Sequence, residues 1–128
     1  MAVGGYPTLF EDRDPRTWAR QHLGHIPVLD PGLPATIQDV VRVIAHLSDP
    51  DRILLFGSRA RGDHRELSDF DLYVEGVRDP KGLMLARLDA TEGYLTLRQV
   101  DIVPDFEASD GLRERALQEG RVVYERRD

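Results

Sequence analysis

The feature that most constrains this chain is a short apolar run that ends in glycine and serine and precedes two aspartates at alternate positions. The run Arg52–Phe56 is apolar after its first residue, which is typical of a strand buried on both faces. Gly57 and Ser58 then predict a sharp turn out of that strand. A strand covered on both faces needs further elements on either side, so the sequence predicts a layered domain.

The rest of the chain alternates between helical and strand-like segments. From Thr36, apolar residues recur at the spacing of one helix face, and Thr36 with Asp39 resembles a capping pair. A helix is expected at residues 81–90, and it carries Leu83, Leu85 and Leu88. The other expected elements are a helix at residues 112–119 and strands at residues 70–74, 94–103 and 122–124. This order predicts an α/β (α+β) fold, a small mixed sheet of about four strands flanked by helices.

The first 35 residues differ in composition from the remainder. Five of the eight prolines lie there, so residues 1–35 are expected to form a proline-rich arm with a short helix from Pro15 to Leu23. Trp18 is expected to pack this arm on the domain, residues 36–128, or on a partner. The longest apolar run is too short to cross a bilayer, the N-terminus does not resemble a signal peptide, and cysteine is absent. These features predict a cytoplasmic protein.

Three aspartates predict a metal site. Asp69 and Asp71 alternate along a strand, so they project from one face while Phe70 and Leu72 pack on the other. Two such carboxylates repel each other and need a cation between them, and Mg²⁺ is a hard ion that carboxylates and phosphates often share. Asp101 lies on another expected strand and could complete a site for two metal ions that clamp the oxygens of an in-line displacement.

The Gly57-Ser58 turn predicts an anion site. It leaves a buried strand and opens a helix, where free backbone N–H groups meet an anion and glycine permits close approach. The Ser58 hydroxyl can donate a further hydrogen bond, and either Arg59 or Arg61 could supply a guanidinium fork for phosphate. The stretch does not match the P-loop pattern of a nucleotide-binding ATPase.

These residues together resemble a known signature. Gly57-Ser58, then ten residues from Arg59 to Ser68, then Asp69-x-Asp71 is similar to the motif of the DNA polymerase β-like nucleotidyltransferase superfamily. The fuller string is most similar to the minimal nucleotidyltransferases, called MNT proteins, and the resemblance extends from about Thr36 to Tyr124.

The resemblance implies roles for the individual residues. In this family the aspartates matched by Asp69 and Asp71 bind both Mg²⁺ ions, and the one matched by Asp101 binds one ion and can activate the acceptor hydroxyl. The matched Gly57-Ser58 pair holds the β,γ-phosphates of the nucleotide. The implied reaction moves a nucleoside monophosphate, usually AMP from ATP, and releases pyrophosphate.

The resemblance also bears on partners. The sequence lacks the helical module that larger family members use to hold an acceptor, so we expect another chain to supply it. MNT proteins commonly act as antitoxins that modify HEPN-family toxins with AMP, and this is the leading hypothesis. A small hydroxyl acceptor such as an aminoglycoside, or an antitoxin that neutralises by binding alone, are the alternatives. The net charge of −6 argues against non-specific nucleic-acid binding and suits a basic partner.

Overall fold

A computed structural model of the chain describes residues 15–63, 69–91 and 100–127. Four strands form one sheet in the order β3-β2-β1-β4. These strands are β1 (Arg52–Phe56), β2 (Phe70–Glu75), β3 (Val100–Pro104) and β4 (Arg121–Glu125). Strand β1 pairs antiparallel with β2 and with β4, whereas β2 and β3 run parallel. The predicted small mixed sheet is therefore confirmed.

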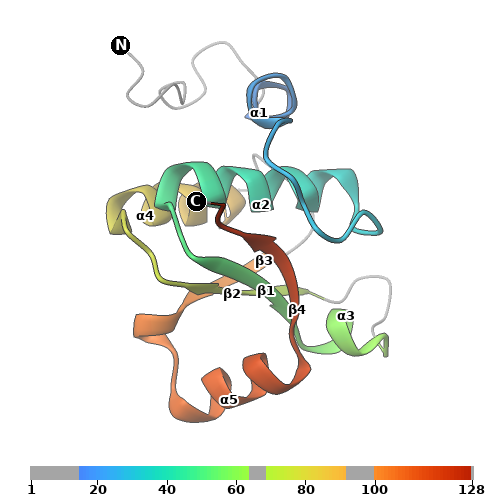
Figure 1. The fold of residues 1–128 in the computed structure, drawn as a ribbon, viewed down its shortest axis with the longest axis vertical. Coiled ribbons are helices and arrows are strands. Elements are labelled where there is room, and N and C mark those ends of the chain that lie inside the picture. The colour runs from blue at the N-terminus through green and yellow to red at the C-terminus, as the bar shows by residue number, and fades with distance from the viewer. Residues whose placement is uncertain (1–14, 64–68, 92–99, 128) are drawn as a thin grey trace.

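Helices cover both faces of this sheet (Figure 1). The helices are α1 (Pro15–Leu23), α2 (Ala35–Ser48), α3 (Ser58–Arg61), α4 (Pro80–Thr91) and α5 (Asp110–Glu119), with a 3₁₀ turn, η3, at Asp105–Glu107. Helices α2 and α4 lie together on one face, α1 packs outside α2, and α5 lies on the opposite face. Within the described ranges, no helix has the length and apolar character needed to cross a membrane.

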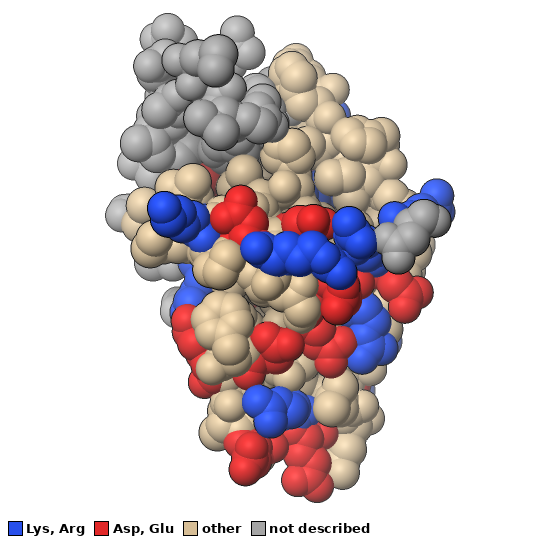
Figure 2. Space-filling model, turned by 60° about the vertical axis from the view of Figure 1, so that its left-hand side comes forward, with Lys and Arg blue, Asp and Glu red and all other residues tan. Residues whose placement is uncertain are grey.

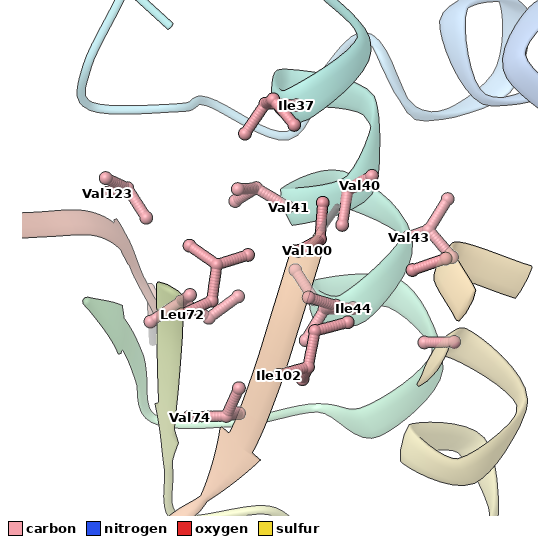
Figure 3. Packing of buried hydrophobic residues seen from close by; sticks show 14 of the residues in the cluster. Ile37, Val40, Val41, Val43, Ile44, Leu72, Val74, Val100, Ile102 and Val123 are labelled. Atoms are coloured by element: carbon pink, nitrogen blue, oxygen red, sulfur yellow. The ribbon is translucent and has the colours of Figure 1, made fainter. Parts of the chain in front are cut away.

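The main core lies between the sheet and α2 (Figure 3). Helix α2 directs Val41 and Ile44 toward the sheet, while Val43 points toward α4. The strands meet this helix with side chains from every second position, which are Leu72, Val74, Val100, Ile102 and Val123. All these side chains are buried, so this face holds most of the apolar area that stabilises the fold.

A smaller apolar cluster lies on the other face of the sheet. Leu54 and Phe56 of β1 and Tyr73 of β2 pack there against Ala116 of α5. Their neighbours in the chain belong to the main core, because successive side chains of a strand point to opposite faces. Strand β1 is thus buried on both faces, as its apolar run predicts.

Helix α4 packs against α2 more closely than its sequence indicates. A Cβ atom on Gly82 would lie 1.7 Å from the carbonyl oxygen of Leu47, so glycine is needed where the two helices meet. The buried residues of α4 are Gly82, Leu83, Ala86, Asp89 and Ala90. Of the three leucines expected in this helix, Leu83 is buried, whereas Leu85 and Leu88 are 43% and 46% exposed. Gly82 and the small alanines of this side permit the close packing.

The start of α2 also differs from the prediction. The helix begins at Ala35 after Pro34, and no side chain caps it, so Thr36 lies within the first turn and is not the cap. Asp39 is buried and accepts a hydrogen bond from Nε of Arg20 at 2.8 Å. Its carboxylate therefore links α1 to α2 instead of completing a capping pair.

Helix α1 is attached to the main core. Ala19 and Leu23 are buried in it, and the Leu29 N–H donates to the carbonyl oxygen of Val123 in β4 at 2.8 Å. The short helix Pro15–Leu23 is present, while the boundary after residue 35 stays a prediction. The Trp18 side chain and residues 94–99 of the expected third strand lie outside what the structure describes, and the described part of that strand ends at Pro104.

Candidate active site

The parallel pairing of β2 with β3 brings two of the predicted acids together. Asp71 and Asp101 are register partners, and both alternate with residues of the main core, so their side chains lie on the α5 face of the sheet. Asp71 is half-buried and Asp101 is exposed. Asp69 is exposed just before β2 begins. Asp71 and Asp101 therefore occupy the same face as the small cluster around Tyr73.

Asp71 is electrostatically unfavourable as an isolated carboxylate. Burial, and then repulsion from Asp101 and Asp69, raises the pKa of Asp71 to about 6, although Arg115 and Arg61 act in the opposite direction. Burial and like charges both disfavour the ionised form. A cation at this position would relieve that repulsion.

The Gly57 turn lies directly against Asp71. Phe56 pairs with Asp71 across β1 and β2, which brings the end of β1 to the acids. Gly57 has a φ of 77°, and a Cβ atom there would lie 2.5 Å from Oδ2 of Asp71. Both the backbone conformation and the contact require glycine. Helix α3 starts at the next residue, Ser58, so its first N–H groups, which have no partner within the helix, lie beside the acids.

The two arginines of α3 point to opposite faces of the sheet. The Arg59 guanidinium lies over the Phe70 ring, 4.3 Å from its centroid, and Phe70 belongs to the main core. Arg61 donates from Nη1 to Oε1 of Glu119 at 3.1 Å, and Glu119 is the last residue of α5. Arg61 is thus the arginine on the face of the acids, a choice that the sequence leaves open.

Ion pairs with acidic side chains engage many of the arginines in the described part of the chain. These arginines are Arg20, Arg42, Arg52, Arg61, Arg78, Arg87, Arg113, Arg121 and Arg126. Figure 2 shows the result on one face, where basic and acidic side chains alternate and do not separate into patches of one sign. Arginine content alone therefore says little about phosphate binding.

The donor set fits a hard divalent cation. Among residues 15–63, 69–91 and 100–127, no group of three or more acidic or histidine side chains is arranged to hold a metal ion. Asp71 and Asp101 nevertheless supply carboxylates from paired positions of two adjacent strands, and burial, together with repulsion from Asp101 and Asp69, raises the pKa of Asp71. Mg²⁺ is commonly held by one or two carboxylates together with water and substrate phosphates.

The sequence patterns assign no role to two residues near the site, Arg115 and Glu119. Arg115 acts electrostatically on Asp71, and Glu119 pairs with Arg61. They are four positions apart on α5, which places them on one side of that helix. The spacing of four positions is the sequence signal that could have pointed to these two residues. Many exposed helices show the same spacing, so it does not single them out.

Comparisons with known proteins show what the chain as a whole is similar to. The family described as polymerase beta, nucleotidyltransferase matches residues 38–128. A structure of a toxin–antitoxin with AMP-PNP is 22% identical, covers 72% of this chain and 73% of its own, and superposes with a TM-score of 0.52. A structure assigned to a minimal nucleotidyltransferase is 37% identical, covers 66% of this chain and 85% of its own, and gives a TM-score of 0.50. No curated protein matches the sequence.

Proposed function

Since the chain belongs to the polymerase β nucleotidyltransferase family, we propose that it transfers AMP from ATP to a hydroxyl group of a partner protein. The observation that carries the proposal is the contact of three parts: Asp71 lies beside Asp101 in the sheet, and the Gly57 turn lies against Asp71. A pair of carboxylates can hold the metal ions of nucleotidyl transfer, and a glycine turn can hold the phosphates of the nucleotide.

Asp69, Asp71 and Asp101 are the proposed metal-binding residues. Bound Mg²⁺, two ions in the family pattern, would neutralise these carboxylates and the charge that develops on the phosphates. Without a cation, burial and the neighbouring acids hold the pKa of Asp71 near 6, which supports the assignment.

The turn and Arg61 are the proposed phosphate-binding groups. Gly57 leaves room for a phosphate oxygen beside the backbone, and the Ser58 hydroxyl and the first N–H groups of α3 can donate to it. Arg61 lies on the face of the acids, whereas Arg59 is stacked on Phe70 on the other face. We therefore assign the guanidinium fork to Arg61.

The proposed reaction is an in-line displacement at the α-phosphorus of ATP. The acceptor oxygen forms a new bond to that phosphorus, and the bond from the phosphorus to the bridging oxygen of pyrophosphate breaks. Asp101 is exposed on the edge strand β3, where it can reach an acceptor that approaches from outside. We assign to Asp101 the proton of the acceptor hydroxyl as well as one metal ion.

A protein acceptor is favoured over a small molecule by the comparisons. The fold is shared with a toxin–antitoxin solved with AMP-PNP, and the sequence is closer to a minimal nucleotidyltransferase. The net charge of −6 suits a basic partner through complementary potentials. A HEPN-type toxin in the cytoplasm, where ATP is available, is the partner we propose.

The test is transfer of label from α-³²P-ATP in the presence of Mg²⁺. The protein is incubated with a candidate toxin encoded beside it and, separately, with a panel of aminoglycosides. We expect label on the toxin, lost in Asp101→Asn and retained in the control Asp110→Asn, whose exposed acid lies outside the site. Label on an aminoglycoside alone would overturn the protein acceptor. Neutralisation of the toxin without any label would establish an antitoxin that acts by binding.

A further inference from the structure

Glu119, the last residue of α5, contacts Arg61 and has no role in the proposed reaction. Glu119 Oε1 accepts a hydrogen bond from Arg61 Nη1 at 3.1 Å across 58 positions of the sequence. The Glu119 side chain is 24% exposed and that of Arg61 is 44% exposed. Figure 1 shows the end of α5 and the start of β4 beside α3. Glu119 therefore reaches the candidate site from α5, a helix that carries none of the predicted site residues.

The stability of the fold does not explain this pair. Ion pairs as exposed as this one contribute only ~0–1 kcal/mol. Helix α3 has four residues and buries none of them, so few apolar contacts set its orientation. The contacts of its two arginines, Arg59 on Phe70 and Arg61 with Glu119, hold it from opposite faces of the sheet.

The hydrogen bonds that Arg61 makes within the described part of the chain leave some of its donors available. Its Nε donates to Oδ2 of Asp63 at 3.2 Å, and its Nη1 donates to Glu119. A guanidinium has five N–H donors in a fixed plane, so the two on Nη2 can bind an anion while both carboxylates keep their bonds. Arg61 also acts electrostatically on Asp71, which places this charge within reach of the acids.

We propose that Glu119 is a positioning residue that holds the Arg61 guanidinium on the Asp71 side of the sheet, where it meets the triphosphate of the bound nucleotide. The inference rests on the proposed function, since it assumes that the site binds a nucleoside triphosphate. Glu119 acts through Arg61 and touches neither nucleotide nor metal. Its carboxylate orients the planar fork in advance, so less rotational freedom is lost when phosphate binds.

The test measures the dissociation constant of AMP-PNP with Mg²⁺ for Glu119→Ala and Glu119→Gln. The matched control is Glu114→Ala, which removes the same charge from an exposed position of α5 that hydrogen-bonds Gln118. We expect Glu119→Ala to weaken binding about 5- to 10-fold, as the loss of one charge-assisted contact would. Glu119→Gln keeps an acceptor oxygen and should weaken binding less, and Glu114→Ala should stay within about twofold of wild type.

A second variant separates positioning from general electrostatics. In an Arg61→Ala background, Glu119→Ala should cause no further loss of AMP-PNP affinity, because the residue through which it acts is gone. In turnover assays of Glu119→Ala, KM for ATP should rise while kcat stays within about twofold. Glu119→Gln preserves the shape of the side chain and carries the test if Glu119→Ala unfolds.

Three results would overturn the inference. Tighter binding by Glu119→Ala would mean that Glu119 competes with phosphate for Arg61. Equal effects of Glu119→Ala and Glu114→Ala would mean that only net charge matters. Failure of the wild-type protein to bind AMP-PNP would instead refute the proposed function, and the inference with it.

Discussion

The two faces of the sheet divide stability and chemistry between them. On the α2 face, alternate residues of β2, such as Phe70 and Leu72, are buried in the main core. On the α5 face of the same strand, Tyr73 belongs to the smaller apolar cluster, and Asp71 lies on the same face near the start of the strand. Neighbouring residues of one strand therefore have different tasks, because side chains alternate between faces.

This difference shows how a small domain can hold repelling acids. The apolar area buried on the α2 face stabilises β2 and β3. The acids can then remain close to one another at a position where their repulsion works against folding. Substitutions at neighbouring positions of β2 should consequently have different effects: on the α5 face they should reduce activity, and on the α2 face they should reduce stability.

Replacing Asp71 by Asn should slow transfer strongly without preventing folding. We expect a rate loss of about 100- to 1,000-fold, comparable to the loss of one preorganised electrostatic group in other enzymes. Stability in metal-free buffer should be unchanged or slightly higher, because the substitution removes a carboxylate that is partly buried and repelled by Asp101. Initial rates and urea midpoints measure the two quantities. A variant that unfolds, or that keeps more than about a tenth of the rate, would contradict the division of tasks.

Replacing Leu72 by Ala, one position further along β2, should do the opposite. Leu72 is fully buried in the main core, and such truncations cost about 2–5 kcal/mol of unfolding free energy. Urea denaturation gives the loss. Transfer activity per folded molecule, measured well below the unfolding transition, should stay close to wild type. Loss of activity in molecules that remain folded would show that the core face also shapes the site.

The arginines of α3 extend the comparison beyond the sheet. Arg61→Ala should weaken ATP binding about 10- to 100-fold, since hydrogen bonds to charged groups are worth about 1.5–3 kcal/mol. Arg59→Ala should leave ATP affinity almost unchanged and lose about 0.5–1 kcal/mol of stability with its contact to Phe70. Calorimetric titration and urea melts measure the two effects. If Arg59→Ala reduces ATP affinity more than Arg61→Ala does, the assignment of the phosphate contact is reversed.

The pH dependence of stability should show the smallest effect. The folded-state pKa of Asp71, about 6, lies above the ordinary aspartate value of 3.8, so the folded protein binds this proton more tightly than the unfolded chain. The contribution of Asp71 to stability is therefore full below about pH 4 and is lost as the pH rises toward 6. Above pH 6 the repulsion remains, and Mg²⁺ should offset it.

Urea midpoints of the wild-type protein and of Asp71→Asn, compared between pH 4 and 7 in EDTA, test this dependence. The wild type should lose stability relative to the variant across that range, and added Mg²⁺ should reduce the difference above pH 6. Asp101→Asn should also reduce it, because the neighbouring charge is gone. A difference that does not vary with pH would mean that Asp71 titrates like an ordinary aspartate.

Local pattern explains what could be predicted of the fold. The strand Arg52–Phe56 has its predicted bounds, because an apolar run that lies between Pro50 and Gly57 is too short for a typical helix. The local pattern does not reveal which side of α4 is buried: Leu83 is buried, while Leu85 and Leu88 are exposed. Which side of that helix faces inward depends on the close contact at Gly82 with α2, and a contact between distant segments leaves no mark in the local pattern.

The same holds for the candidate site. Alternation along a strand is a local property, so the sequence by itself determined that Asp71 opposes Phe70 and Leu72. The parallel register that sets Asp101 beside Asp71, the choice of Arg61 over Arg59, and the reach of Glu119 from α5 were decided by the tertiary structure alone. The physical reason is that backbone sterics act between neighbours in the chain, whereas packing and electrostatics act between whatever the fold brings within a few ångströms.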